Sequence, residues 1–165
     1  MIIFASYSLT KVLKKMFHVR PALAGDSPVI IDFQLKMAKE TEDADLDRSE
    51  LSKGVEAVFN DPGKGTYYVG ETEGKVVSSM MITREWSDWR NRWVYWLQSV
   101  YVVPEQRGKG LFRKMYEYIK EHVLQDPGVS GIRLYVDATN LNALRVYEAV
   151  GMDDDHYKLC EWMKE

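Results

Sequence analysis

A strand that breaks through a basic, glycine-containing turn into a helix limits what this chain can fold into more than any other feature. An apolar, β-branched run that includes Val100 ends at Pro104, and the turn Arg107-Gly-Lys-Gly110 follows it. From Leu111 onward, apolar residues recur at helical spacing. The backbone N–H groups and the dipole at the start of such a helix attract anions, and the two cations of the turn add positive charge. The segment therefore predicts a phosphate or pyrophosphate site.

Two well-known phosphate loops do not fit this turn. A Walker A loop needs Ser or Thr directly after Gly-Lys, whereas the chain continues from Gly110 into Leu111 and Phe112. A dinucleotide fingerprint needs a third glycine where Arg113 stands, and it opens a series of parallel strands. Neither a P-loop NTPase nor a dinucleotide-binding domain is indicated.

Hydrophobic periodicity divides the chain into short strands and helices. A helix is expected to begin at Asp26 or Ser27, before Pro28, and turn residues at 60–63 and 126–128 are expected to end two later helices. The predicted strands cover residues 17–20, 66–70, 76–84, 92–103, 132–136 and 156–163, and the predicted helices cover roughly 27–37, 51–59, 111–123 and 143–150. This order predicts one α/β domain over 17–165, with residues 1–16 as a dispensable extension upstream of Met16.

Composition excludes several classes of protein. The net charge of -3 in 165 residues argues against a nucleic-acid binder, which usually presents a basic face. No apolar run approaches the roughly 18 residues that a membrane helix needs. The single cysteine, Cys160, excludes an internal disulfide and is expected to lie buried in the last strand. A cytoplasmic location is the simplest expectation, and no His spacing suggests a metal site.

A second motif, thirty residues after the turn, indicates which kind of phosphate-binding turn the first motif is. Arg107-Gly-Lys-Gly110 resembles the Arg/Gln-x-x-Gly-x-Gly/Ala turn of the GCN5-related N-acetyltransferase (GNAT) superfamily, which binds the pyrophosphate of acetyl-coenzyme A. Asn140, Ala143, Tyr147 and Gly151 match the later part of that family's signature at each spacing, and Met152 replaces its Phe. The resemblance covers roughly residues 93–152. Phe112 departs from it, because the family has Gly or Ala there; we expect this ring to turn into the core.

The resemblance implies a fold and a set of cofactor contacts. The fold is a mixed, mostly antiparallel sheet with helices on both faces, in which two parallel strands splay apart to form the acetyl-CoA cleft. The end of the strand before the turn would pair with the pantetheine arm, and the amides of the turn would hold the phosphates with help from the side chains of Arg107 and Lys109. The implied cofactor residues are Val100, Val102, Val103, Arg107, Gly108, Lys109, Gly110, Leu111, Phe112, Asn140, Asn142 and Tyr147.

The residues that would perform the chemistry are less completely specified. Tyr147 is either a buried aromatic or a general acid, since a phenol of pKa about 10 can protonate a leaving thiolate. The strand before the turn carries no carboxylate, so no general base is assigned; Gln98 and Ser99 are candidates to orient the substrate or a water. Glu85 and Asp88 are either solvated carboxylates or bases that act through water.

Two surface features have alternative interpretations. The acidic run 40–47 is either a solvated loop or a negatively charged surface that attracts a cationic acceptor amine. The tryptophans at 86, 89, 93 and 96 have three alternative roles: they line an acceptor pocket, they lie in a homodimer interface, or they pack in the core.

The leading interpretation is an acetyl-CoA-dependent N-acetyltransferase that moves the acetyl group directly to a primary amine, of a small molecule or of a protein, in a ternary complex. The alternatives are a non-catalytic acyl-CoA-binding or regulatory module and a transferase that uses a longer acyl-CoA.

Overall fold

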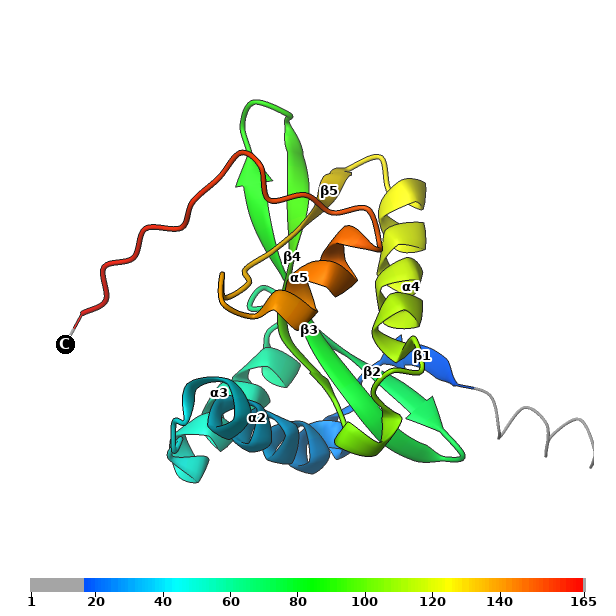
Figure 1. Cartoon of the computed structure of the whole chain (residues 1–165), viewed down its shortest axis with the longest axis vertical. Helices are drawn as coiled ribbons and strands as arrows, with labels where there is room; N and C mark the ends of the chain where they lie inside the picture. Colours follow the sequence, from blue (N-terminus) through cyan, green and yellow to red (C-terminus); the bar gives the residue numbers. More distant parts are fainter. Residues whose placement is uncertain (1–16, 165) are drawn as a thin grey trace, which may run out of the picture. The chain divides into compact units, whose positions relative to one another are not determined.

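The computed structural model describes residues 17–164, and the chain divides into two compact units, Met1–Arg133 and Leu134–Glu165. The first unit contains nearly all of the sheet and three of the helices (Figure 1). The proposed dispensable extension, residues 1–16, lies outside the described residues.

A five-stranded mixed sheet forms the frame of the first unit. Its strands lie side by side in the order of the sequence. The first four are antiparallel to their neighbours, and the fifth runs parallel to the fourth. They are β1 (His18–Pro21), β2 (Thr66–Thr72), β3 (Lys75–Ser87), β4 (Arg92–Val102) and β5 (Val129–Leu134). The mixed, mostly antiparallel sheet predicted from the resemblance is confirmed.

Within residues 17–164, three longer helices belong to the first unit and one short helix to the second. Two single turns of 3-10 helix, η1 (Ala24–Asp26) and η2 (Pro104–Gln106), precede α2 and the glycine turn. Asp47 caps the second long helix, because its side chain accepts a hydrogen bond from the Glu50 amide. The helices are α2 (Ser27–Glu42), α3 (Arg48–Asn60) and α4 (Leu111–Gln125), and then α5 (Leu141–Glu148).

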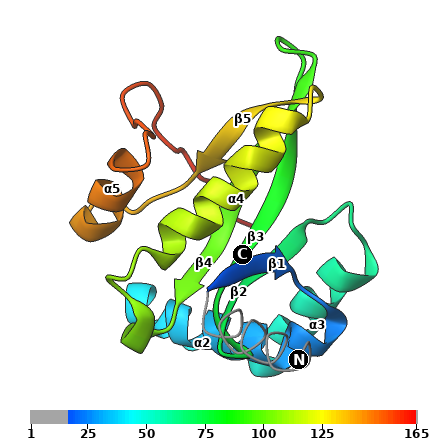
Figure 2. The ribbon, with the colours of Figure 1, turned by 90° about the vertical axis from the view of Figure 1, so that its right-hand side faces the viewer.

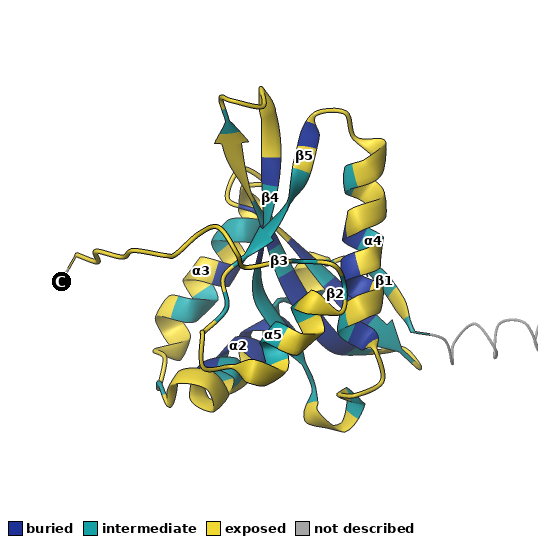
Figure 3. Cartoon of the chain, turned by 45° about the horizontal axis from the view of Figure 1, so that its top comes forward, coloured by how far each residue is buried: buried dark blue, intermediate teal, exposed yellow. Residues whose placement is uncertain are grey.

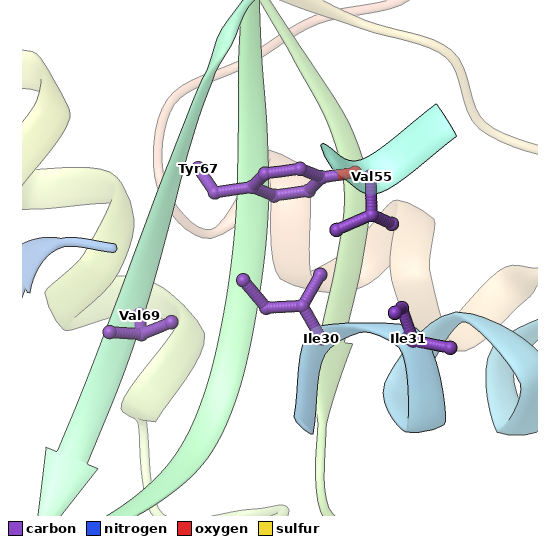
Figure 4. Packing of buried hydrophobic residues seen from close by; sticks show 5 residues of the cluster. All are labelled: Ile30, Ile31, Val55, Tyr67 and Val69. Atoms are coloured by element: carbon purple, nitrogen blue, oxygen red, sulfur yellow. The ribbon is translucent and has the colours of Figure 1, made fainter. Parts of the chain in front are cut away.

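Side chains that alternate along β2 bring helices to both faces of the sheet. Tyr67 and Val69 point to one face, where they form a buried cluster with Ile30 and Ile31 of α2 and Val55 of α3 (Figure 4). Tyr68, between them, points to the other face, where its ring meets Tyr118 of α4 with centroids 6.0 Å apart. Successive strand residues face opposite ways, so one strand anchors α2 and α3 on one side and α4 on the other.

The β3–β4 hairpin is longer than its sequence suggests. β3 continues to Ser87 instead of ending near residue 84, so the predicted connection 85–91 shrinks to a short turn. Trp86 and Trp93 pair across the two strands, with ring centroids 5.0 Å apart and nearly edge to face. Cross-strand aromatic pairs of this kind stabilise a hairpin, which explains why the strands persist. The outer end of the hairpin is exposed (Figure 3), and Trp89 in the turn has 91% of its surface exposed.

The predicted last strand is wrong. Residues 156–163 form neither helix nor strand, and Cys160, expected to be buried there, is exposed. A strand needs a partner strand to satisfy its backbone N–H and C=O groups. The described part of the second unit contains no complete strand that could pair with residues 156–163. The predicted strand 132–136 also lies earlier than expected, at Val129–Leu134.

None of the helices within residues 17–164 combines the length and the apolar composition needed to cross a membrane.

Candidate functional site

The last part of β4 contains a β-bulge. Gln98 pairs with Met81 and Tyr101 pairs with Ser79, so Ser99 and Val100 together oppose one residue of β3. Ser99 has a φ of 52°, a left-handed conformation that is uncommon for a residue other than glycine. A bulge bends its strand and redirects the residues after it, and such bulges are frequent beside active sites. The residues predicted to meet the pantetheine arm therefore begin at an irregular point of the sheet.

Beyond its first residues, β4 diverges from the parallel strand β5. The Trp93 amide donates to the Gly128 carbonyl at 2.8 Å, and the Ser130 hydroxyl donates to the Trp93 carbonyl at 3.1 Å. Both bonds lie at the beginning of the two strands, which separate toward their carboxyl ends (Figure 2). This arrangement matches the expectation that two parallel strands splay before the glycine turn.

The glycine turn joins β4 to α4 through η2. Gly108 and Gly110 have φ values of 73° and 71°, and Gly110 is the N-cap residue of α4. Both positions need glycine for conformational reasons, since a side chain is strained at such φ values. A Cβ atom at either position would meet open space. Because the N-cap residue is glycine, it has no side chain to cap the first backbone N–H groups of the helix.

Both cations of the turn are bound to neighbouring protein atoms. Lys109 Nζ donates to the Glu105 carbonyl at 2.8 Å and to Gln106 Oε1 at 3.1 Å. Arg107 Nε donates to the Val102 carbonyl at 2.8 Å, and its Nη2 donates to Glu40 of α2 at 2.7 Å. The sequence offered no signal for the contact with Glu40, because the two residues lie far apart in the chain. The backbone of the turn is consequently its leading candidate for anion binding.

The first two residues of α4 differ in how far they are buried. Leu111 is buried in the core with Met115. Phe112 is half-buried and stacks on Tyr116, one helical turn later, with ring centroids 6.2 Å apart. The inward rotation expected for Phe112 is thus only partly realised.

The turn fits a pyrophosphate. It combines two glycines in left-handed conformation, open space where their Cβ atoms would stand, and the N-terminus of a 15-residue helix. Backbone amides at such a place suit phosphate oxygens, and the helix dipole favours their negative charge.

The polar residues considered for acceptor binding lie on neighbouring strands. Gln98 donates to the Thr83 hydroxyl at 2.7 Å. Glu85 accepts from the Trp96 indole at 2.8 Å and from Arg133 at 2.9 Å, one bond to each carboxylate oxygen. Glu85 therefore holds β3, β4 and β5 together, which makes it a poor candidate for a general base.

The acidic run 40–47 begins in α2 and continues as an exposed loop, in keeping with one of its two interpretations. Its first residues belong to α2, and Glu40 pairs with Arg107. Lys39 pairs with Asp43 at 2.8 Å and with Asp45 at 3.3 Å, while Asp47 caps α3. Lys39 and Arg107 are the cations paired with this run, so most of the negative charge that was considered as an attraction for a cationic acceptor remains exposed.

The second unit contains the remaining predicted residues. Asn140 is the N-cap of α5, and its side-chain oxygen accepts from the Ala143 amide at 3.0 Å. Asn142, in the first turn of α5, is exposed. Tyr147 is half-buried, and this burial raises the pKa of its phenol, which keeps the hydroxyl protonated at neutral pH.

A cavity of about 360 Å³ lies at the opposite end of α4 from the glycine turn. Its lining includes Tyr68 of β2, Tyr95 of β4 and His122 of α4, and none of the residues predicted for the site. Among residues 17–164, no group of three or more His, Cys, Asp or Glu side chains is arranged to hold a metal ion.

Comparisons with known proteins identify a matching protein family and several relatives. The family model described as "Acetyltransferase (GNAT) family" matches residues 33–152. The thialysine N-epsilon-acetyltransferase of Bos taurus is 37% identical over 86 residues, which cover 52% of this chain and 49% of that protein. The chain thus spans about half the length of the curated relatives it matches.

Solved structures extend the likeness over nearly the whole chain. A protein described as a possible acetyltransferase, from Clostridium difficile 630, is 41% identical with a TM-score of 0.85, covering 91% of this chain and 99% of that one. A structure from Clostridium acetobutylicum, solved with acetyl-CoA, has a TM-score of 0.70 and 16% identity, covering 88% and 96%. At that identity, the second likeness shows the fold alone.

Proposed function

Because the chain belongs to the acetyltransferase (GNAT) family, we propose that it transfers an acetyl group from acetyl-CoA directly to a primary amine in a ternary complex. The observation that carries this proposal is the glycine turn. Gly108 and Gly110 present backbone at the N-terminus of α4, and the bulge at Ser99 redirects β4 immediately before it. Members of the family use acetyl-CoA, whose thioester supplies an activated acetyl group.

The edge of β4 is suited to orient the donor. Val103 uses its amide to bond the Val77 carbonyl of β3, so the backbone groups of its neighbour Val102 face the other way, because groups alternate along a strand. The Val102 carbonyl is held by Arg107. The backbone of Val100 and the Val102 amide are then the groups that pair with an amide-containing arm.

Tyr147 is the proposed general acid. Its raised pKa keeps the hydroxyl protonated, so the phenol can give a proton or a hydrogen bond to a departing thiolate. No carboxylate is assigned as the base, because Glu85 is engaged by Trp96 and Arg133. Gln98 and Ser99 remain the proposed residues for orienting the attacking amine or a water.

The proposed acceptor is a small alkyl amine of the thialysine kind, in keeping with the relatives' activity. The test is the release of free thiol from acetyl-CoA by the full chain, measured with thialysine, lysine and an amine-free control. Thialysine-dependent thiol release is the expected result. If acetyl-CoA binds but releases no thiol in the presence of either amine, the non-catalytic acyl-CoA module is favoured instead. The hydrogen bonds that engage Glu85 also favour that module.

A further inference from the structure

Glu40 joins α2 to the glycine turn, although 67 residues separate it from Arg107 in the sequence. One carboxylate oxygen accepts from Arg107 Nη2 at 2.7 Å, and the other accepts from the Tyr101 hydroxyl at 3.3 Å. Both oxygens are therefore used. The burial of Tyr101, together with the charge of Glu40, raises the pKa of that phenol, so it remains a donor.

Arg107 is held from three directions. Besides Glu40, its guanidinium donates through Nε to the Val102 carbonyl at 2.8 Å, and it lies over the Tyr101 ring at 5.3 Å from the centroid. A planar guanidinium with two directed hydrogen bonds and a ring beneath it has little freedom to rotate. Its backbone is extended, and the left-handed Gly108 follows immediately.

We propose that Glu40 is a positioning residue for the glycine turn: by fixing Arg107, it sets the direction in which the amides of Gly108 and Gly110 point. This inference rests on the proposed function, in which those amides receive the pyrophosphate of the donor. Arg107 then contributes through its backbone and its position, while its charge is neutralised by Glu40.

Direct binding of phosphate by the Arg107 side chain would predict the opposite effect of removing Glu40. If Arg107 bound phosphate directly, Glu40 would compete for the same guanidinium, and removal of the carboxylate would strengthen donor binding. Both side chains are also partly exposed, with 47% and 40% of their surfaces accessible. An ion pair of that exposure contributes little to global stability, so the melting temperature is not the informative measurement.

The first test uses the free protein. In ¹⁵N-labelled full chain, Glu40→Gln is expected to shift the amide resonances of Gly108 and Gly110. The matched control is Asp32→Asn, which breaks a 2.8 Å ion pair between α2 and Arg48 of α3. The control should leave both glycine resonances in place. Unchanged glycine resonances in Glu40→Gln would overturn the proposal.

The second test measures the affinity for acetyl-CoA and for S-acetylpantetheine, which lacks the phosphates. Glu40→Gln should weaken acetyl-CoA binding about tenfold and leave the affinity for S-acetylpantetheine unchanged. Arg107→Met should have the same effect, and the double variant should lose no more than either single one.

Three outcomes contradict the role of Glu40 while leaving the proposed function intact: wild-type acetyl-CoA affinity in Glu40→Gln, tighter binding, or an equal loss for both donors. A wild-type protein that binds neither acetyl-CoA nor CoA would instead remove the proposed function. The two failures are therefore distinguishable.

Discussion

Tyr147 links local burial to chemistry at the scale of a single residue. Burial favours the neutral phenol, and a general acid must be protonated before it acts. Tyr147→Phe keeps the ring and removes the hydroxyl. We expect kcat to fall about a hundredfold with KM for acetyl-CoA little changed, since general acids typically contribute that much. Thiol-release kinetics check this result, with the exposed Tyr157 as the control, replaced in Tyr157→Phe. Wild-type kcat in Tyr147→Phe would leave the residue as packing only.

The glycines offer a comparison within one chain. Gly110 has a φ of 71°, whereas Gly54 lies inside α3, and a Cβ at either position meets open space. Gly110→Ala should lower the free energy of unfolding by about 1 kcal/mol because of backbone strain. Gly54→Ala should raise it by about 0.5–1 kcal/mol, because alanine favours the helix. Urea unfolding measures both, and equal signs for the two variants would contradict the assigned conformations.

At the scale of elements, the cap of α5 is the contact that the sequence predicts most directly. Asn140→Ala removes the hydrogen bond to the Ala143 amide and should cost about 1 kcal/mol of local stability. Faster hydrogen exchange at the amides of α5 is the expected observation. Asn142→Ala, two residues later, is the matched control, because alanine is the better helix former there. Equal protection in both variants would argue against the cap.

Periodicity explains which elements could be predicted. α4 and the strands that flank it have regular apolar spacing, and the Asn140–Gly151 motif located α5. The expected strand 156–163 failed because an alternating pattern does not supply a pairing partner. The bulge at Ser99 was equally hidden, since serine carries no sequence signal for a positive φ. The ion pair of Glu40 with Arg107 depends on a tertiary contact that no local pattern contains.

The stability of the whole molecule should depend on pH through the carboxylate of Asp26, which is paired with Arg20. The Arg20 guanidinium donates two bonds to Asp26, at 2.7 and 3.0 Å, and one to Glu71 of β2 at 3.1 Å. The hydrogen bonds from Arg20 hold the pKa of Asp26 below its ordinary value of 3.8. A group with a lowered folded pKa stabilises the protein above its unfolded pKa and loses that effect as the pH falls through the folded value.

Asp26→Asn should therefore lower the free energy of unfolding by about 1 kcal/mol at pH 7, because the pair is partly solvated. The difference from wild type should shrink progressively below pH 3.8. Urea titrations between pH 7 and pH 2 measure this, with Asp153→Asn, on an exposed segment, as the control. A difference that stays constant down to pH 2 would contradict the assignment.

The central claim is that the glycine turn receives the pyrophosphate of acetyl-CoA, and calorimetric titration tests it most directly. Acetyl-CoA and CoA should both bind the full chain, and S-acetylpantetheine should bind at least about tenfold more weakly. A donor at 100-fold over its Kd should also stabilise the fold by about 2.7 kcal/mol. Equal affinity for donors with and without phosphates, or no binding of acetyl-CoA at all, would contradict the claim.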